Sequence, residues 1–422
     1  MNKLFSSFNQ SNHSDWQNTI IKELKGLDYN ETLVYETLEG IKINPFYTTE
    51  VSEVKNFTLN KTQKGWDVFT EITNQDLLNL NEVDGLVIDL EQNKPNKNFK
   101  NILLSKNPYL FNNYLNEPEN AFFKLDIYGG LFKSGNWFKD QESDETLIKN
   151  VLNTSNSKKV ICVDNSIFQN AGANIVQQIA IALCHANEYI EKFGNDAINR
   201  IYFNFSVGGN FFFEIAKLRA FRFLWDSFVA SKNINSEAYL FTENSFRNKS
   251  KLDKDNNTIR NSIECCAAIL GGSNGILINS HEIISLNKNE FSFELAHKIQ
   301  LILKQESFFN EFLDPIAGNY YVESITDELI EKSSALFREI EKSGGLIIGM
   351  KTGSIQKMVE DSNQKEFDLF NNNKNILIGV NKYKLEKLDY INEEAEKTFI
   401  NTQLFNPISP TRLALKIEKT NE

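Results

Sequence analysis

Three polar residues are candidates for catalysis because of where they fall in the sequence. Asp164, Asn204 and Glu243 each lie in or just after a short apolar run that reads as a buried strand. In an α/β barrel the reacting side chains stand at the carboxyl ends of the strands, where carboxylates can act as general acids or bases. A self-sufficient barrel enzyme would need such a cluster, and these three residues are the candidates that the sequence offers.

Two further segments could bind or activate a ligand. Gly208-Gly209-Asn210 leads into a predicted helix, and the free N–H groups of a helix N-terminus favour an anion. A strand-to-helix turn that needs glycine for its backbone geometry explains the same residues, and we prefer it. Asp314 could be a base, but Pro315 and Gly318 favour a turn in which the aspartate caps its own loop.

Metal and buried-charge chemistry receive little support. The four histidines do not pair with one another or with cysteine at ligand spacing, so no metal site is predicted. Lys217 and Arg219 lie in a segment rich in Phe and Leu, where a buried cation must be paired. We therefore predict structural ion pairs with Glu214 or another neighbour.

Composition limits the class of protein. The chain has 422 residues and a net charge of −11, which argues against a nucleic-acid or anionic-membrane surface. No apolar run is long enough for a membrane span, and the N-terminus lacks the apolar region of a secretory signal. The four cysteines have no zinc or disulfide spacing, which favours a reducing, cytoplasmic setting.

From about residue 65 the sequence alternates between short apolar runs and helical stretches. The predicted strands are Val83 to Leu90, Ile102 to Leu104, Phe122 to Ile127, Val160 to Val163, Ile201 to Val207, Ala238 to Thr242 and Ile276 to Ile278. The predicted helices between them are Gln169–Lys192, Asn210–Ser231, Asn256–Leu270 and Phe291–Phe308. Such alternation indicates parallel strands in an α/β fold, and a (β/α)8 TIM-type barrel or an open doubly wound sheet would both satisfy it.

The two ends of the chain differ from this pattern. Near the start, Trp16, Ile20 and Leu24 recur at helical spacing, and Gly26 ends the helix. Further on, Ser324-Ile-Thr-Asp327 fits a capping box that opens a helix, 376–381 reads as a strand, and a charged helical tail follows. We predict an N-terminal arm over 1–60, a barrel over 61–383 and a helical tail over 384–422.

Two runs resemble signatures of the cobalamin-dependent methylmalonyl-CoA mutases. One is Asp314-Pro-Ile-Ala-Gly-Asn-Tyr-Tyr-Val-Glu323, and the other is Asn210-Phe-Phe-Phe-Glu-Ile-Ala-Lys-Leu-Arg-Ala220. The arm is also similar to that family's, with Trp16, Leu24-Lys25-Gly26, Glu39-Gly40-Ile41 and Pro45-Phe-Tyr47-Thr48 in order. The resemblance implies the closed barrel, and an arm that extends across a partner subunit. It is weak between residues 50 and 160.

The resemblance also identifies positions where catalytic members carry polar groups and this chain does not. Their Tyr-His pair aligns with Ser166 and Ile167, and their Arg, His and Gln align with Tyr239, Phe241 and Glu243. In catalytic members the His hydrogen-bonds the thioester carbonyl of the substrate, and Ile167 has no donor for that role. The segments that hold the acyl-CoA have no counterpart between residues 48 and 160. The resemblance therefore predicts no catalytic, cofactor-binding or metal-binding residue in this chain.

The cofactor of the family is adenosylcobalamin, usually bound through D-x-H-x-x-G in a C-terminal domain. The sequence has no such string, and the nearest window, around Asn279-Ser-His281, lacks the Asp and the Gly. The chain stops where that domain would begin, so we expect the corrin on a partner.

The resemblance as a whole favours the small (beta) subunit of a heterodimeric methylmalonyl-CoA mutase. A large subunit would carry the acyl-CoA substrate, the adenosylcobalamin and the catalytic residues, and this chain would stabilise it. Contacts with the partner are expected along the arm at Trp16, Leu24 and Tyr47. The alternative is a catalytic acyl-CoA mutase barrel that uses a separate cobalamin-binding subunit, which would need a polar, CoA-sized channel.

Overall fold

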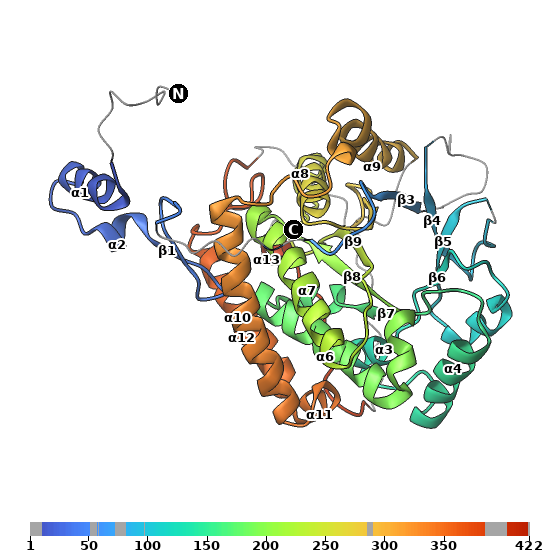
Figure 1. Ribbon diagram of the computed structural model, residues 1–422. Coiled ribbons are helices and arrows are strands. Elements are labelled where there is room, and N and C mark those ends of the chain that lie inside the picture. Colours follow the sequence, from blue (N-terminus) through green and yellow to red (C-terminus); the bar gives the residue numbers. More distant parts are fainter. Residues whose placement is uncertain are drawn as a thin grey trace, which may run out of the picture.

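Eight parallel strands form the centre of the molecule (Figure 1). The computed structural model describes residues 11–50, 57, 59–71, 82–96, 98–284, 290–384 and 403–420. The strands are β3 (Asp67–Glu71), β4 (Gly85–Asp89), β5 (Lys100–Leu104), β6 (Ala121–Phe123), β7 (Ile161–Asp164), β8 (Ile201–Val207), β9 (Leu240–Asn244) and β10 (Gly275–Leu277). Their order in the sheet is β6-β5-β4-β3-β10-β9-β8-β7.

The two edge strands of this sheet meet and close it into a barrel. A parallel bridge joins Phe122 of β6 to Lys159, just before β7. The N–H of Phe123 donates to the carbonyl of Lys159 at 2.9 Å, and the N–H of Cys162 donates to the carbonyl of Leu125 at 3.0 Å. Closure leaves no unpaired edge. The predicted (β/α)8 barrel is confirmed, and the open sheet is excluded.

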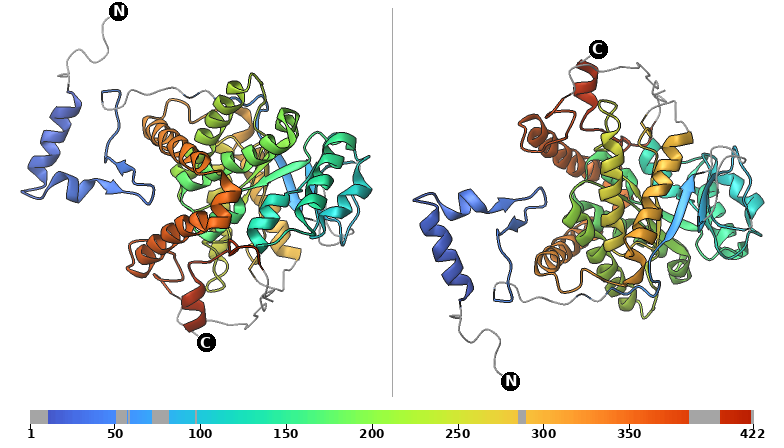
Figure 2. Two further views of the ribbon diagram at one scale, coloured as in Figure 1. Left: turned by 90° about the horizontal axis from the view of Figure 1, so that it is seen from below. Right: turned by 90° about the horizontal axis from the view of Figure 1, so that it is seen from above.

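Helices cover the barrel unevenly (Figures 1 and 2). The helices that follow the barrel strands are α3 (Ile127–Ser134), α4 (Gln141–Thr154), α5 (Ser166–Ala171), α6 (Ile175–Phe193), α7 (Phe211–Ser231), α8 (Asn256–Leu270) and α9 (Glu290–Leu301). After α9 come a π-helical turn (Ile302–Glu306), a 3-10 turn (Phe309–Glu311), α10 (Tyr320–Lys342), α11 (Leu346–Thr352) and α12 (Ser354–Asn371).

The first half of the barrel departs from the alternation. The described residues between β4 and β5 form turns, and the connection from β5 to β6 contains only the 3-10 helix Pro108–Tyr114. The same region has the weakest sequence resemblance to the mutase family, so the irregular structure and the weak resemblance occur together. The helical layer is concentrated around β7 to β10.

Three local predictions are corrected. The helix expected over Gln169–Lys192 breaks at Gly172, where φ is +102°, and α6 starts afresh behind an Asn174 capping box. The capping box at Ser324 is wrong, because Asn319 accepts from the N–H of Val322 and α10 begins at Tyr320. The strand expected over 376–381 is a turn with one isolated bridge, Ile378 to Lys382.

The N-terminal arm stands away from the barrel (Figures 1 and 2). It consists of α1 (His13–Glu23), α2 (Tyr29–Leu33) and a small antiparallel pair, β1 (Tyr35–Glu36) with β2 (Lys42–Ile43). Neither α1 nor α2, both wholly described, contains a buried residue. The arm therefore lacks a hydrophobic core of its own.

A short segment of the arm anchors it to the body. Ile41 is only 2% exposed and belongs to the main hydrophobic core. The carboxylate of Glu39 accepts from the N–H of Ile175 at 3.3 Å, and Asn174 donates to the carbonyl of Leu38 at 3.3 Å. An acidic side chain at the N-terminus of α6 is favoured by the free N–H groups and the helix dipole. The Glu39-Gly40-Ile41 motif is thus the attachment point of the arm.

The described part of the tail lies against the barrel. The N–H groups of Leu404, Ile408, Thr411 and Leu413 donate to carbonyls of Gly135, Phe132, Asn170 and Arg247 respectively. Only one short helix, α13 (Leu415–Thr420), is present in 403–420, and residues 385–402 of the predicted helical tail lie outside the described residues.

Candidate functional site

Alternate residues of the strands point into the barrel, and one layer of them fills its centre. This layer has one buried side chain from each of the eight strands: Phe69, Val87, Ile102, Phe122, Cys162, Tyr202, Phe241 and Leu277. Successive strand residues face opposite sides, so a barrel interior is built from such layers. None of the eight is more than 9% exposed. The layer is a packed apolar core across the barrel axis.

Aromatic rings make up most of the volume of this layer. The Phe69 and Phe241 rings meet edge to face at 5.2 Å between centroids, and Phe122 lies 5.4 Å from Tyr202. Tyr239, one layer below, meets Phe122 edge to face at 4.8 Å. Edge-to-face pairs of this kind stabilise a core beyond their buried area. The lining at this level is mostly hydrocarbon, with the Tyr202 hydroxyl and the Cys162 thiol as polar groups.

A cluster of charged and polar side chains covers the carboxyl ends of the strands. Lys124 Nζ lies 3.8 Å from a carboxylate oxygen of Asp164 and 3.7 Å from one of Glu243. The amide of Asn204 donates to Asp164 at 2.8 Å and to Glu243 at 2.9 Å. Ser166 Oγ donates to Asp164 at 2.6 Å. The two carboxylates therefore share one cation and one amide.

These contacts fix the charges of the cluster. Burial opposes the charged form of Lys124, but the adjacent Asp164 and Glu243 carboxylates outweigh it and raise its pKa above the usual range. Burial likewise opposes the charge on Asp164, but Lys124, Ser166 and Asn204 lower its pKa. A general acid or base works best when its pKa lies near the operating pH. The pKa values of Lys124 and Asp164 are both shifted away from neutral pH. The two side chains therefore suit a permanent ion pair better than proton transfer.

A cavity of about 960 Å³ opens at this end of the barrel. Lys124, Asp164 and Ile167 line its inner part, and Trp137 and Phe138 line its rim. Residues 407–410 of the tail form another wall. Ile167, whose side chain packs against the core, presents only hydrocarbon to this cavity and no hydrogen-bond donor.

The positions singled out in the sequence occupy three levels of the barrel. Ser166, Ile167 and Glu243 are brought together at the mouth, Phe241 lies in the central layer, and Tyr239 lies below it. Tyr239 donates to Asp67 at 3.2 Å, far along the axis from the mouth. Phe241 and Glu243 are two residues apart on β9, and Tyr239 directly precedes this strand, so the spacing matches a common inward orientation.

Sequence reasoning missed Lys124. It follows directly after the apolar run of β6, and a charge at an inward position of a barrel strand must find a partner. That alternation was the signal that could have identified it. Asp164, Asn204 and Glu243 do come together as a barrel enzyme would require, but the two carboxylates are held by a lysine that lies between them.

The two signature runs are joined by one buried arginine. Arg219 in α7 holds both carboxylate oxygens of Asp314, at 2.6 and 2.7 Å, and Glu323 at 2.7 Å. Glu323 also accepts from the N–H of Gly318 at 3.1 Å. The prediction that Asp314 caps its own loop is corrected, because its carboxylate binds Arg219 instead. Such a bidentate arrangement is structural in this fold, since it orients a loop against a helix.

The other predicted charges are also paired. Lys217 forms the expected ion pair with Glu214, and it donates to the carbonyl of Ser206 at 2.7 Å. Glu214 lies in the first turn of α7, beside Gly208, where an anionic ligand would otherwise sit. A carboxylate already occupies the position that favours negative charge, which supports the turn interpretation of Gly208-Gly209.

The described part of the chain also has neither a metal site nor a membrane-spanning helix. Within those ranges, no group of three or more His, Cys, Asp or Glu side chains is arranged to hold a metal ion. No helix in the same part of the chain is long and apolar enough to cross a membrane. The four cysteines are all free thiols.

Fold and site define a (β/α)8 barrel with a filled axis and an ion-paired mouth, and comparison with known proteins places it in a family. The family model for methylmalonyl-CoA mutase matches residues 123–405. The chain belongs to the methylmalonyl-CoA mutase family. The match begins in β6, at the point where the helical layer of the barrel becomes regular.

Individual relatives extend this result. The methylmalonyl-CoA mutase small subunit of Porphyromonas gingivalis is 27% identical over 444 residues, covering 90% of this chain and 71% of that protein. The large subunit from the same organism is 31% identical over 264 residues, covering 60% of this chain and 37% of that protein. The mutase of Escherichia coli is 33% identical over 229 residues, covering 52% and 32%. The chain thus spans about a third of the length of these last two relatives.

Proposed function

We propose that this chain is the non-catalytic small subunit of a two-chain methylmalonyl-CoA mutase. In this proposal a large subunit binds the acyl-CoA and adenosylcobalamin and interconverts (R)-methylmalonyl-CoA and succinyl-CoA by a radical mechanism. The present chain stabilises that subunit as a pseudoenzyme. Similarity to proteins named small and large subunit of the same mutase supports the assignment.

The observation that carries the proposal is the filled barrel axis. A catalytic barrel of this family would need a polar channel for an acyl-CoA, and the centre here is closed by Phe69, Phe122 and Phe241. At the mouth, Ile167 supplies no donor, and the Lys124–Asp164 pair is held in its charged form. These features argue against the alternative of a catalytic barrel that borrows cobalamin from a separate subunit.

His281 bears on where the cofactor binds, because it is the histidine in the sequence window nearest to the corrin-binding motif D-x-H-x-x-G. This side chain is 7% exposed, and its Nε2 lies 3.9 Å from Asp255 at the surface. A buried imidazole in this loop does not fit a cobalt ligand, which must project from the protein into an open site. We therefore assign the corrin to the partner. We further propose that the complex is cytoplasmic and binds neither nucleic acid nor membrane.

The arm supplies the proposed partner contact. Trp16 lies 5.0 Å from the ring of Phe46, and Leu24 is the C-cap of a helix that buries nothing within the chain. Tyr47 packs against Tyr321 at the junction with the body. An amphipathic segment without an intramolecular core gains its stability when a second chain covers it. Trp16, Leu24 and Tyr47 remain the proposed interface residues.

The purified chain alone provides the test. It should neither shift the absorbance of adenosylcobalamin nor turn over methylmalonyl-CoA when a detached cobalamin-binding protein is added. The large chain from the same source is the positive control. Turnover by this chain with the detached protein would establish the catalytic alternative and refute the proposal.

A further inference from the structure

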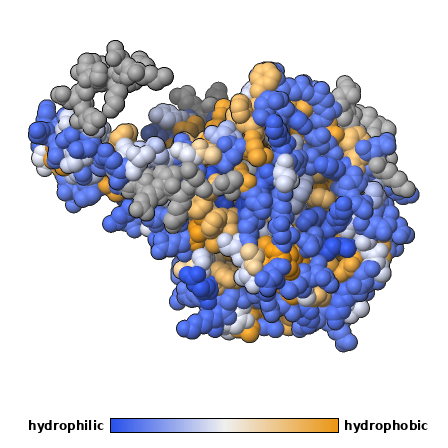
Figure 3. Space-filling view, in the orientation of Figure 1, coloured by the Kyte–Doolittle hydropathy of each residue, from blue (hydrophilic) through white to orange (hydrophobic). Residues whose placement is uncertain are grey.

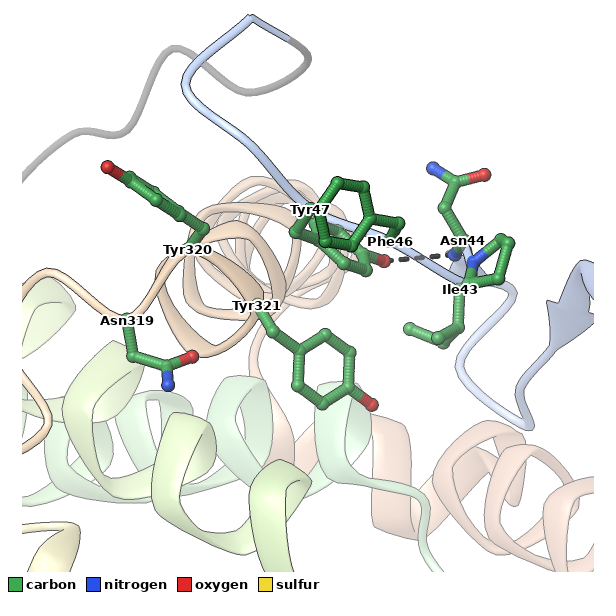
Figure 4. A pocket seen from close by; sticks show the side chains of 8 residues that line it. Ile43, Asn44, Phe46, Tyr47, Asn319, Tyr320 and Tyr321 are labelled. Carbon is green, nitrogen blue, oxygen red and sulfur yellow. Dashed lines mark hydrogen bonds between the residues drawn. The ribbon is translucent and has the colours of Figure 1, made fainter. Parts of the chain in front are cut away.

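A shallow aromatic pocket lies where the arm joins the body. Its volume is about 400 Å³, and its lining residues are Ile43, Asn44, Pro45, Phe46, Tyr47, Asn319, Tyr320 and Tyr321. Figure 4 shows Phe46 and Tyr47 from the arm on one side and the two tyrosines at the start of α10 on the other. The pocket is at the small end of the range for ligand sites, roughly 300–1,000 Å³.

Two separate signatures of the sequence build this pocket. Tyr47 comes from the Pro45-Phe-Tyr47-Thr48 run, and Tyr320 and Tyr321 come from the Asp314 to Glu323 run. The Tyr47 and Tyr321 rings lie 5.1 Å apart, and Tyr321 meets Phe212 of α7 at 5.3 Å. Arg219 and its carboxylates fix the loop before α10, so this wall of the pocket is rigid.

The rim of the pocket is exposed although it is aromatic. Phe46 is 43% exposed and Tyr320 is 39% exposed. Tyr320 points away from Tyr321, toward solvent (Figure 4). The space-filling view shows apolar side chains at the surface beside this junction (Figure 3). Rigid aromatic side chains that line a pocket are typical of the residues that dominate protein interfaces.

The pocket is electrically neutral. None of its described lining residues carries a formal charge. Burial raises the pKa of the phenols of Tyr47 and Tyr321, so both remain protonated at physiological pH. Tyr47 Oη accepts from the N–H of Asn44 at 3.1 Å, which holds the arm wall in place. An uncharged side chain with an apolar body fits this chemistry better than a phosphate or a carboxylate.

We propose that this pocket, bounded by Phe46, Tyr47, Tyr320 and Tyr321, is the socket for a bulky, uncharged side chain of the large subunit. The inference rests on the proposed function and specifies where the two chains engage most tightly. The socket is continuous with the arm, whose helices α1 and α2 have no buried residue. One partner segment could therefore cover the arm and insert an anchor into the socket.

Site-specific photo-crosslinking tests which molecule occupies the socket. Tyr320→p-benzoylphenylalanine should crosslink to the large subunit in the co-expressed complex, and mass spectrometry should place the link on a hydrophobic side chain. Phe138→p-benzoylphenylalanine is a matched control, because Phe138 is 42% exposed but lies at the rim of the barrel mouth. A crosslink from position 320 to a second copy of this chain would overturn the inference, as would none to the large subunit.

Binding measurements separate this inference from the proposed function. We expect Phe46→Ala and Tyr320→Ala each to weaken binding of the large subunit about 10- to 100-fold, with an unchanged melting temperature for the isolated chain. Phe138→Ala should change binding less than about threefold. If wild-type chain binds the large subunit and the socket variants bind equally well, the socket is refuted while the subunit assignment stands. If wild-type chain does not bind at all, the proposed function itself fails.

Discussion

At the mouth of the barrel, Lys124 lies between two carboxylates and an asparagine bridges them, whereas in the arm no side chain of α1 or α2 is buried. The charged groups at the barrel mouth are paired within the chain, and the barrel axis is packed with aromatic rings. The arm leaves Trp16 and Phe46 to pack mainly on each other. The proposed function expects this difference, because it makes the barrel a scaffold and leaves the arm for contact with another protein.

The largest expected effect lies in the body of the protein, at Arg219. Arg219→Met should lower the free energy of unfolding by about 3–5 kcal/mol, because it leaves the buried carboxylates of Asp314 and Glu323 unpaired. Chemical denaturation of the isolated chain measures it. The exposed Arg338→Met is the control, and its effect should stay within about 0.5 kcal/mol. Equal effects for both variants would show that the signature runs are not held by this arginine.

The next effect concerns Lys124 and the two carboxylates at the barrel mouth. Lys124→Met should lower the free energy of unfolding by about 1–3 kcal/mol, because Asp164 and Glu243 would repel each other without it. The partial exposure of the lysine keeps the loss below that at Arg219. Lys133→Met, at the rim of the same cavity, is the matched control with little expected change. A stabilised Lys124→Met protein would contradict the structural role of the cluster.

In the arm we expect a large effect on binding of the large subunit and a small effect on stability. Trp16→Ala should weaken binding of the large subunit at least about tenfold while changing the free energy of unfolding by less than about 0.5 kcal/mol. Calorimetric titration and denaturation measure the two quantities. Lys22→Ala, an exposed charge on the same helix, is expected to have a small effect on both. If Trp16→Ala destabilised the isolated chain but left binding intact, the arm would be part of the fold rather than an interface.

The substitution Ile167→Ala tests whether the barrel mouth takes part in the mutase reaction. Ile167→Ala should lower the free energy of unfolding by roughly 1 kcal/mol, since its side chain packs against the core but is only half-buried. Mutase turnover of the assembled complex should be unchanged. A hundredfold fall in turnover with unchanged folding would mean that this position takes part in the reaction.

The smallest effect is a pH dependence at Asp164. Its pKa is lowered in the folded protein, so its contribution to stability is present above the unfolded pKa, about 4, and is lost as the pH falls through the folded value. Asp164→Asn should therefore be less stable than wild type at pH 6, and the gap, under about 1 kcal/mol, should close as the pH falls through the folded pKa of Asp164. A gap that is independent of pH would show that the carboxylate charge contributes nothing.

Much of the fold could be predicted from local patterns. The apolar run Ile201 to Val207 and the helical stretch Asn256–Leu270 match β8 and α8 residue for residue. A strand that is buried on both faces reads as a nearly continuous apolar run, and β8 is buried along its whole length. Between β4 and β6 the described connections contain only turns and one 3-10 helix, so the alternation of strands and helices is weak there.

The site was harder to predict because its contacts are distant in sequence. Arg219 reaches Asp314 and Glu323 across 95 and 104 positions, and no local rule joins them. The same holds for the socket, where Tyr47 meets Tyr321. Strand alternation predicts that Tyr239, Phe241 and Glu243 share one direction, into the barrel. It does not predict which of them reaches the mouth, because that depends on how deep each residue lies along the barrel axis.

Co-expression with the cobalamin-carrying large subunit tests the central claim most directly. The size of the complex and the mutase activity would be recorded for the pair and for each chain alone, with and without the catalytic histidine of the large chain. The account predicts a complex with one copy of each chain whose activity disappears when that histidine is replaced. Activity that persists without the large chain's histidine would locate catalysis in this barrel and contradict the account.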